Sequence, residues 1–185
     1  MRLENSFEVS ASVAQSWRLL NDVPSVVPCM PGAELVEVTG ETTWKAKLHV
    51  KLGPIALQFL ADVTRERMDE TIGLVVLGVK AREAKGRGSA EATIESTLTE
   101  SGDGTRVDIV TELALRGAVA QYGRGVVADV ASRLTTQFAG CIAGKLADAP
   151  APAPRAVTEP EPIGGIRLLL GALWRSLFRR SEGAT

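Results

Sequence analysis

A long run of alternating hydrophobic and polar residues is the clearest pattern in this chain. From Trp44 to Leu52 every second residue is hydrophobic, and three lysines and a histidine stand between them. A period of two is typical of a β-strand with one dry and one wet face. Gly102-Asp103-Gly104 has the composition of a hairpin turn, so short antiparallel connections are expected. The predicted strands cover residues 2–9, 44–52, 55–63, 72–79, 90–98 and 107–115.

The period changes near Ala118, where hydrophobic residues begin to recur every four positions. This spacing predicts a helix of about 28 residues whose apolar stripe packs on the dry face of the sheet. A short helix is also predicted from the capping residue Ser12 to about Leu20, before a proline-rich stretch that permits only short turns. We therefore expect an α+β domain with an antiparallel sheet and one long helix. The stripe consists of Tyr122, Val126, Val130, Leu134, Phe138, Ile142 and Leu146.

The end of the chain has a different composition, which divides the protein into three segments. Residues 1–148 form the predicted domain, and residues 149–162 contain five prolines and are expected to be a flexible, extended spacer. Residues 163–185 form a predicted amphipathic tail that resumes helical periodicity. The tail residues predicted to contact a membrane are Ile166, Leu170, Leu173, Trp174, Leu177, Phe178, Arg175, Arg179 and Arg180.

Charge separates the tail from the domain, although the formal net charge of the whole chain is only −1. Residues 1–148 include 16 basic and 19 acidic residues, whereas residues 163–180 include four arginines and no acidic residue. A helix with an apolar face and arginines is typical of a segment that lies in a membrane interface, where each arginine contributes about 1 kcal/mol near anionic lipids. Insertion into a groove of a partner protein is the alternative, and the spacer disfavours packing on the tail's own domain. The near-neutral charge argues against a nucleic-acid partner. No hydrophobic run reaches the roughly 20 residues that span a bilayer.

A curved sheet covered by one helix can enclose a cavity, and the long predicted helix is rich in glycine and alanine. These small residues either enlarge an apolar pocket or only allow the helix to approach the sheet closely, and both interpretations remain open. In the first case the expected occupant is a hydrophobic ligand. The residues predicted to line the pocket are Trp44, Leu48, Phe59, Leu74, Tyr122, Val126, Val130, Leu134 and Phe138.

Residues suited to catalysis or metal binding are few. His49 is the single histidine and stands among lysines on the wet face of a predicted strand, so a solvated side chain is expected. Cys29 and Cys141 have no second cysteine nearby, and no signal peptide is recognised, so we expect free thiols in the cytoplasm. Gly86-Arg87-Gly88-Ser89 precedes a strand and lacks the lysine of a phosphate-binding loop, so a hairpin turn is predicted. We predict no catalytic residue and no metal site.

Five short motifs stand out along the predicted domain. They are Leu19-Leu20-Asn21-Asp22, the stretch 27–34 with Cys29-Met30-Pro31-Gly32, Val50-Lys51-Leu52-Gly53-Pro54-Ile55, Gly86-Arg87-Gly88-Ser89-Ala90 and Ala120-Gln121-Tyr122-Gly123-Arg124. Together they resemble the CoxG-type family, named for the G subunit of carbon monoxide dehydrogenase, over about residues 1–147. The order of elements is similar to the helix-grip fold of the START-like (SRPBCC) superfamily. The tail resembles that of members with a proline-rich linker and departs from members that stop after the long helix.

The resemblance implies an accessory protein of aerobic CO oxidation, without catalysis of its own, that links molybdenum-containing CO dehydrogenase to the inner face of the cytoplasmic membrane. The predicted cavity and tail together favour a carrier of a respiratory quinone, menaquinone or ubiquinone, with no covalent cofactor. The alternative is a pure membrane adaptor whose cavity is filled by side chains. An enzyme acting on a lipid-like substrate is a third hypothesis, disfavoured because Tyr122 is the only proton donor among the predicted cavity residues.

Overall fold

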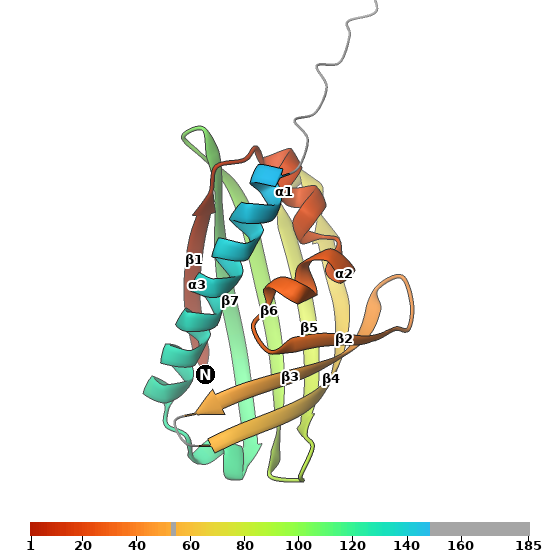
Figure 1. The fold of residues 1–185 in the computed structure, drawn as a ribbon, viewed down its shortest axis with the longest axis vertical. Helices are drawn as coiled ribbons and strands as arrows, with labels where there is room; N and C mark the ends of the chain where they lie inside the picture. The colour runs from red at the N-terminus through yellow and green to blue at the C-terminus, as the bar shows by residue number, and fades with distance from the viewer. Residues whose placement is uncertain (53–54, 149–185) are drawn as a thin grey trace, which may run out of the picture. The chain divides into compact units, whose positions relative to one another are not determined.

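One antiparallel sheet forms the body of the protein (Figure 1). The computed structural model describes residues 1–52 and 55–148, and the predicted Gly53-Pro54 turn, spacer and tail lie outside them. The strand order is β1-β7-β6-β5-β4-β3-β2, which confirms the predicted meander and places β1 beside β7. The strands are β1 (Arg2–Val9), β2 (Ala33–Val38), β3 (Thr43–Leu52), β4 (Ile55–Asp69), β5 (Leu74–Glu83), β6 (Gly88–Ser101) and β7 (Gly104–Gly117). The helices are α1 (Val13–Leu20), α2 (Val23–Val26) and α3 (Arg124–Asp148), with short 3-10 turns η1 (Val27–Cys29), η2 (Glu70–Ile72) and η3 (Ala118–Gln121).

The alternation along each strand decides which of its faces is buried. Leu57 on β4 is 3% exposed, whereas Leu60, three residues later and on the other face, is 49% exposed. Leu48 pairs with Phe59 across β3 and β4, so neighbouring strands present hydrophobic residues to the same side. β5 begins two residues later than predicted, because Glu70–Ile72 form η2 and Gly73 adopts a φ of +65°. That left-handed conformation favours glycine.

α1 begins where the sequence predicted. Ser12 is its N-cap, and its side chain and that of Gln15 form a reciprocal capping box. The side chain of Ser16, fully buried on this helix, donates a hydrogen bond to Thr105 of β7 at 3.2 Å. Thr105 in turn donates to the carbonyl of Ala11 at 2.7 Å. These bonds fix α1 against the sheet beside the second half of α3 (Figure 1).

α3 is shorter than the predicted helix. It begins at Arg124 and contains 25 residues, because η3 and an extended Tyr122 precede it. Gly117 ends β7 with a φ of +75°, and the chain then turns through η3 toward the sheet's dry face. Within the described part of the chain, none of the helices is long and apolar enough to cross a membrane.

Large side chains fill only one end of the space between α3 and the sheet. Phe7 and Phe138 meet edge to face with ring centroids 6.0 Å apart. The fully buried Ile142 of α3 and Trp17 of α1 join the same cluster. The buried cluster at the other end is smaller and consists of Leu57, Phe59, Ala81 and Val119. The sheet is therefore well packed under the second half of α3 and less so under the first half.

The two cysteines form a disulfide, so the expectation of free thiols is wrong. Cys29 of η1 and Cys141 of α3 are bonded, with Cα atoms 5.3 Å apart and a sequence separation of 112. No local pattern near either cysteine indicates this bond, because the contact depends on how α3 lies across η1. The disulfide links the segment that leads into β2 to the packed end of the core.

Candidate functional site

A cavity of about 300 Å³ lies between the first half of α3 and the dry face of the sheet. Eighteen of its twenty wall residues are hydrophobic, and the wall includes no charged residue among those described. Such a volume is at the small end of the range for ligand-binding pockets. The strands contribute Leu3, Leu48, Val50, Leu57, Phe59, Ala61, Val79, Ala81, Ala90, Ala92, Ile94, Thr111, Leu113 and Leu115, and the segment 119–134 contributes Val119, Tyr122, Val127, Val130, Ala131 and Leu134.

Alanines on neighbouring strands create the space. Ala81 on β5 pairs with Ala61 on β4 and with Ala90 on β6, so three short side chains stand side by side on the dry face. Ala131 faces the same cavity from α3. The glycines of the predicted helix do not explain the space by close approach, because a Cβ added at Gly123, Gly125, Gly140 or Gly144 would meet nothing within 4 Å.

Two hydroxyl groups are the only polar side-chain atoms that the described residues bring to the cavity wall. They belong to Thr111 of β7 and to Tyr122, which precedes α3. Each hydroxyl can donate one hydrogen bond and accept others. The lining is therefore almost entirely apolar and suits an apolar molecule. The described wall residues include no nucleophile–base pair for covalent catalysis.

Five of the nine predicted pocket residues line this cavity, and four lie elsewhere. The five are Leu48, Phe59, Tyr122, Val130 and Leu134. Trp44 is buried outside the cavity, with the Arg65 guanidinium 5.6 Å from its ring centroid. Leu74 is buried at the start of β5, and Phe138 packs on Phe7. Val126 is 45% exposed.

The pitch of the helix explains why Val126 and Phe138, both on α3, were wrongly predicted to line the pocket. A spacing of four residues turns by about 40° more than one full turn, so the predicted stripe winds around α3 instead of following one face. Val127, Val130, Ala131 and Leu134 are spaced as i, i+3, i+4 and i+7 and face the cavity together. Val127 was missed because the four-residue stripe excluded it. The missed strand residues, such as Ala90 and Ala92, could have been found from the period of two.

A buried ion pair stands in the turn between β5 and β6, where Glu83 pairs with the wall residue Phe59 of β4. Glu83 has a fully buried side chain and accepts hydrogen bonds from the backbone amides of Lys85 at 2.8 Å and Arg87 at 3.1 Å. The Arg87 guanidinium donates to Glu83 at 3.0 Å and to the carbonyl of Ala56 on β4 at 2.9 Å. Burial alone would raise the pKa of Glu83, but these hydrogen bonds and the charge of Arg87 outweigh it and lower the pKa to about 2. The pair thus ties the β5–β6 turn to the first residues of β4.

Glu83→Gln is expected to lower the free energy of unfolding at neutral pH, because Arg87 loses its counter-ion. The folded-state pKa lies below the ordinary 4.5, so the wild-type protein has the full contribution above about pH 4.5. That contribution decreases as the pH falls from about 4.5 toward about 2, and the difference between wild type and variant disappears with it. Urea unfolding across this pH range measures the effect. Glu70→Gln, at an exposed position, is the control, and an equal loss in both variants would contradict the role of the ion pair.

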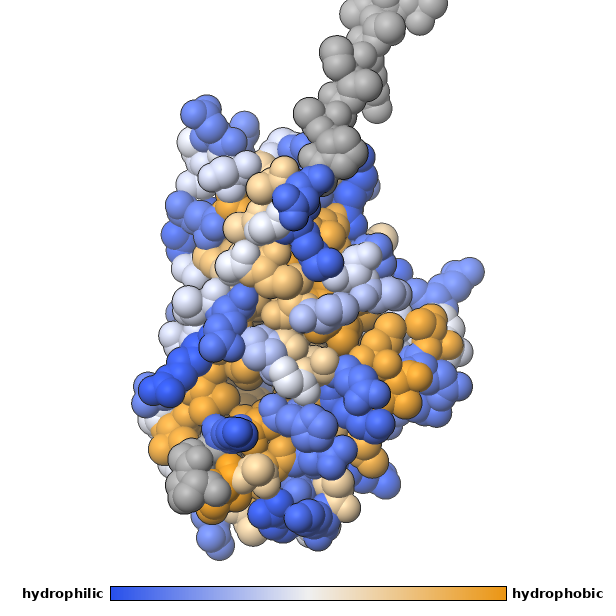
Figure 2. All heavy atoms as spheres, viewed as in Figure 1, coloured by the Kyte–Doolittle hydropathy of each residue, from blue (hydrophilic) through white to orange (hydrophobic). Residues whose placement is uncertain are grey.

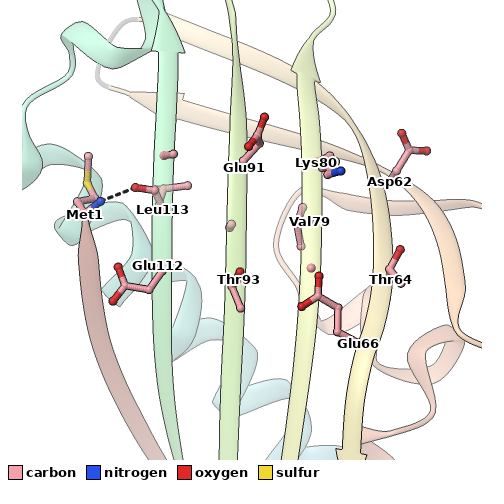
Figure 3. Close-up of a pocket in the computed structure, with 13 residues that line it drawn as sticks. Met1, Asp62, Thr64, Glu66, Val79, Lys80, Glu91, Thr93, Glu112 and Leu113 are labelled. Atoms are coloured by element: carbon pink, nitrogen blue, oxygen red, sulfur yellow. Dashed lines mark hydrogen bonds between the residues drawn. The ribbon is translucent and has the colours of Figure 1, made fainter.

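A second pocket, of about 520 Å³, lies on the wet face of the sheet (Figure 3). Four carboxylates reach it from three strands, and Lys80 stands between them. They are exposed to water, and two already have cationic partners: Glu112 lies 3.6 Å from Arg2, and Glu91 lies 3.8 Å from Arg116. This depression is therefore a solvated charged surface. The four carboxylates are Asp62, Glu66, Glu91 and Glu112.

His49 is exposed on β3. The residues described by the structure contain no group of three or more His, Cys, Asp or Glu side chains that could bind a metal ion. The Gly86–Ser89 stretch contributes to the turn and to the first residues of β6, as its composition predicted.

Comparison with solved structures identifies the fold. A conserved protein from Geobacillus kaustophilus is 23% identical with a TM-score of 0.71, and the match covers 80% of this chain and 95% of that chain. The ZhuI aromatase/cyclase from Streptomyces sp. R1128 is 14% identical with a TM-score of 0.57 over 80% of this chain and 93% of that chain. A START superfamily protein from Mycobacterium smegmatis is 12% identical with a TM-score of 0.53, and the match covers 79% of this chain and 97% of that chain. At these identities the similarity shows the fold alone, and it confirms the predicted helix-grip, START-like architecture.

Comparison with protein families gives a match over most of the chain. The model of CoxG, the G subunit of carbon monoxide dehydrogenase, matches residues 6–147, which include every described strand in whole or in part and nearly all of α3. None of the curated proteins compared with the chain matches it.

Proposed function

The chain belongs to the CoxG family, the G subunit of carbon monoxide dehydrogenase, and on that premise we propose that it carries a respiratory quinone for the molybdenum-containing enzyme. The protein is an accessory subunit in this proposal and catalyses no reaction itself. It takes menaquinone or ubiquinone from the inner face of the cytoplasmic membrane and presents it to the dehydrogenase. The apolar cavity under α3 is the observation that carries the proposal.

The chemistry of a quinone fits this cavity. A quinone ring is flat and apolar and has two carbonyl oxygens that accept hydrogen bonds. The wall offers hydrophobic side chains and the hydroxyls of Thr111 and Tyr122 as donors. A volume of about 300 Å³ suits the ring and the first part of its isoprenoid chain, so the rest of a long chain would extend through the open side.

Retention of the ligand during purification tests the carrier function. The full chain, expressed in a host that makes respiratory quinones, should copurify with about one quinone per protein, detected by native mass spectrometry or by solvent extraction. Protein that never retains a quinone, and does not bind one added in detergent, would favour the alternative of a pure membrane adaptor for the dehydrogenase.

Deletion of residues 163–185 should weaken binding to liposomes by about a hundredfold or more, because each large apolar side chain of the tail contributes about 1.5–3 kcal/mol before the cost of ordering. Co-sedimentation with liposomes measures the effect. Removal of residues 181–185 alone is the matched control, since none of the predicted membrane residues lies there. Equal binding by the protein without residues 163–185 and by the full chain would overturn the tail's role.

A further inference from the structure

Three segments far apart in the sequence meet at the end of the domain that contains the cavity. They are the start of β4, the β5–β6 turn, and η3 with the first turn of α3, all at the lower end of the view in Figure 1. The Arg87 guanidinium binds the carbonyl of Ala56, and the Val119 amide donates to the carbonyl of Arg87 at 3.3 Å. The wall residues Leu57, Val119 and Tyr122 come from the same segments. This end of the domain is therefore continuous with the cavity.

Basic side chains gather at this end, which we call the basic end. Five of its six cations are exposed, and Arg87 is half-buried. The one carboxylate that the described residues place in these segments, Glu83, is buried and paired with Arg87. Beyond these segments, Glu91 lies 3.8 Å from Arg116, and Asp129 is in the second turn of α3. The six cations are Lys51, Arg82, Lys85, Arg87, Arg116 and Arg124.

The loops at the opposite end of the sheet are acidic, while Lys145 in the last turn of α3 is a cation at that end. The connections between β4 and β5 and between β6 and β7 include Asp69, Glu70 and Asp103. The domain has more acidic than basic residues overall, so the basic end stands out against its own background. Evenly distributed charge would promote only solubility. A cluster of cations at one end can orient the domain near a negatively charged surface.

An exposed hydrophobic side chain also lies at this end of the domain, on α3. Val126 on the first turn of α3 is 45% exposed, next to the cavity residue Val127. Figure 2 shows hydrophobic side chains beside the lower part of α3, around a hollow in the surface, with hydrophilic residues among them. Exposed apolar groups together with cations are typical of a surface that meets the headgroup region of a bilayer.

We propose that the basic end of the domain docks on an anionic lipid surface, so that the open side of the cavity faces the bilayer. The inference rests on the proposed function, because it supplies the route by which a lipid-soluble molecule enters the cavity without crossing water. In this arrangement the tail holds the protein at the membrane, and the basic end sets the orientation of the domain. Negative lipid headgroups would balance the exposed cations, and Val126 would lie among the uppermost acyl groups.

The test is a full-length triple variant, Lys51→Gln/Lys85→Gln/Arg116→Gln, measured for binding to vesicles of phosphatidylglycerol and of phosphatidylcholine. We expect about a hundredfold weaker binding to the anionic vesicles, at about fivefold for each cation removed, and no change with the zwitterionic vesicles. The control variant Arg18→Gln/Arg133→Gln/Lys145→Gln makes the same change of charge at exposed positions outside the basic end and should bind nearly as wild type does. Equal losses in the two variants, or none in the first, would overturn the proposal.

A second pair of variants tests the apolar part of this surface. Val126→Asp should weaken binding to anionic vesicles by about tenfold, whereas Val36→Asp, at an equally exposed valine on β2, should not. If the triple variant instead keeps its vesicle binding and loses binding to CO dehydrogenase, the basic end contacts a protein, and lipid docking is refuted. None of the substituted residues lines the cavity, so quinone retention by these variants reports separately on the carrier function.

Discussion

Under the proposed carrier function, the Ala131→Trp variant is expected to bind quinone about a hundredfold more weakly than wild type. Ala131 faces the cavity from the middle of its helical wall, and an indole ring there would occupy space that the quinone ring needs. The loss corresponds to the apolar burial of a group the size of a large side chain. The fold should tolerate the change, because the new side chain enters a space that is already present.

Quinone content after purification and affinity in detergent give the measurement. Ala143→Trp is the matched control, since Ala143 lies on the same helix at an exposed position. In a coupled assay, electron transfer from CO dehydrogenase to membrane quinone should fall with Ala131→Trp and not with Ala143→Trp. Undiminished electron transfer with the cavity filled would refute the carrier function and leave the adaptor.

The second large effect concerns stability. Replacing both Cys29 and Cys141 by alanine should lower the free energy of unfolding by about 2–5 kcal/mol, because the disulfide closes a loop of more than a hundred residues and so restricts the unfolded chain. For a domain of this size the midpoint of thermal unfolding should fall by about 5–15 °C. The same fall should appear when wild-type protein is reduced.

The double variant itself supplies the control, because reductant should not change its midpoint. Two free thiols in wild-type protein that was unfolded without reductant would contradict the bond. The thiol count also bears on the proposed location, since disulfides are uncommon in a reducing cytoplasm. Alkylation inside intact cells, before lysis, shows whether the bond is present at the inner face of the membrane.

The sequence predicted which face of a strand or helix a residue occupies better than it predicted how far along that element the cavity lies. A period of two correctly placed Trp44, Leu48 and Phe59 on the dry face, whereas Leu74 pairs with Thr97 and stands in register with the wet-face residue Lys80. Alternation cannot say how far along a strand a residue stands, so it could not separate the hollow end of the sheet from its packed end. That distinction depends on which strands adjoin, and Ala61, Ala81 and Ala90 become neighbours only in the folded sheet.

The disulfide and the buried Glu83 were not predicted from the sequence, for two different reasons. The disulfide joins residues 112 positions apart, and nothing near either cysteine indicates the partner. Glu83 did leave a signal, because it continues the dry-face series of Val79 and Ala81. A carboxylate at such a position needs buried donors. The hydrogen-bond donors to Glu83 are Lys85 and Arg87, in the turn that follows β5. The composition of Gly86-Arg87-Gly88 predicts a hairpin there but does not indicate that Arg87 pairs with Glu83.

Side chains fill the space between α3 and the sheet unevenly, so a ligand in the cavity would change the stability of the first half of α3. Ile142, Phe7 and Phe138 hold the second half of the helix on the sheet, while the first half covers a space with few partner atoms. A hydrophobic molecule in that space acts as the missing part of the core, and binding stabilises the folded state by an amount that grows with its concentration. The empty protein should therefore exchange amide hydrogens faster in residues 124–134 than in residues 135–148. In the proposed carrier function, release of the ligand would leave the first half of α3 less stable than the second half.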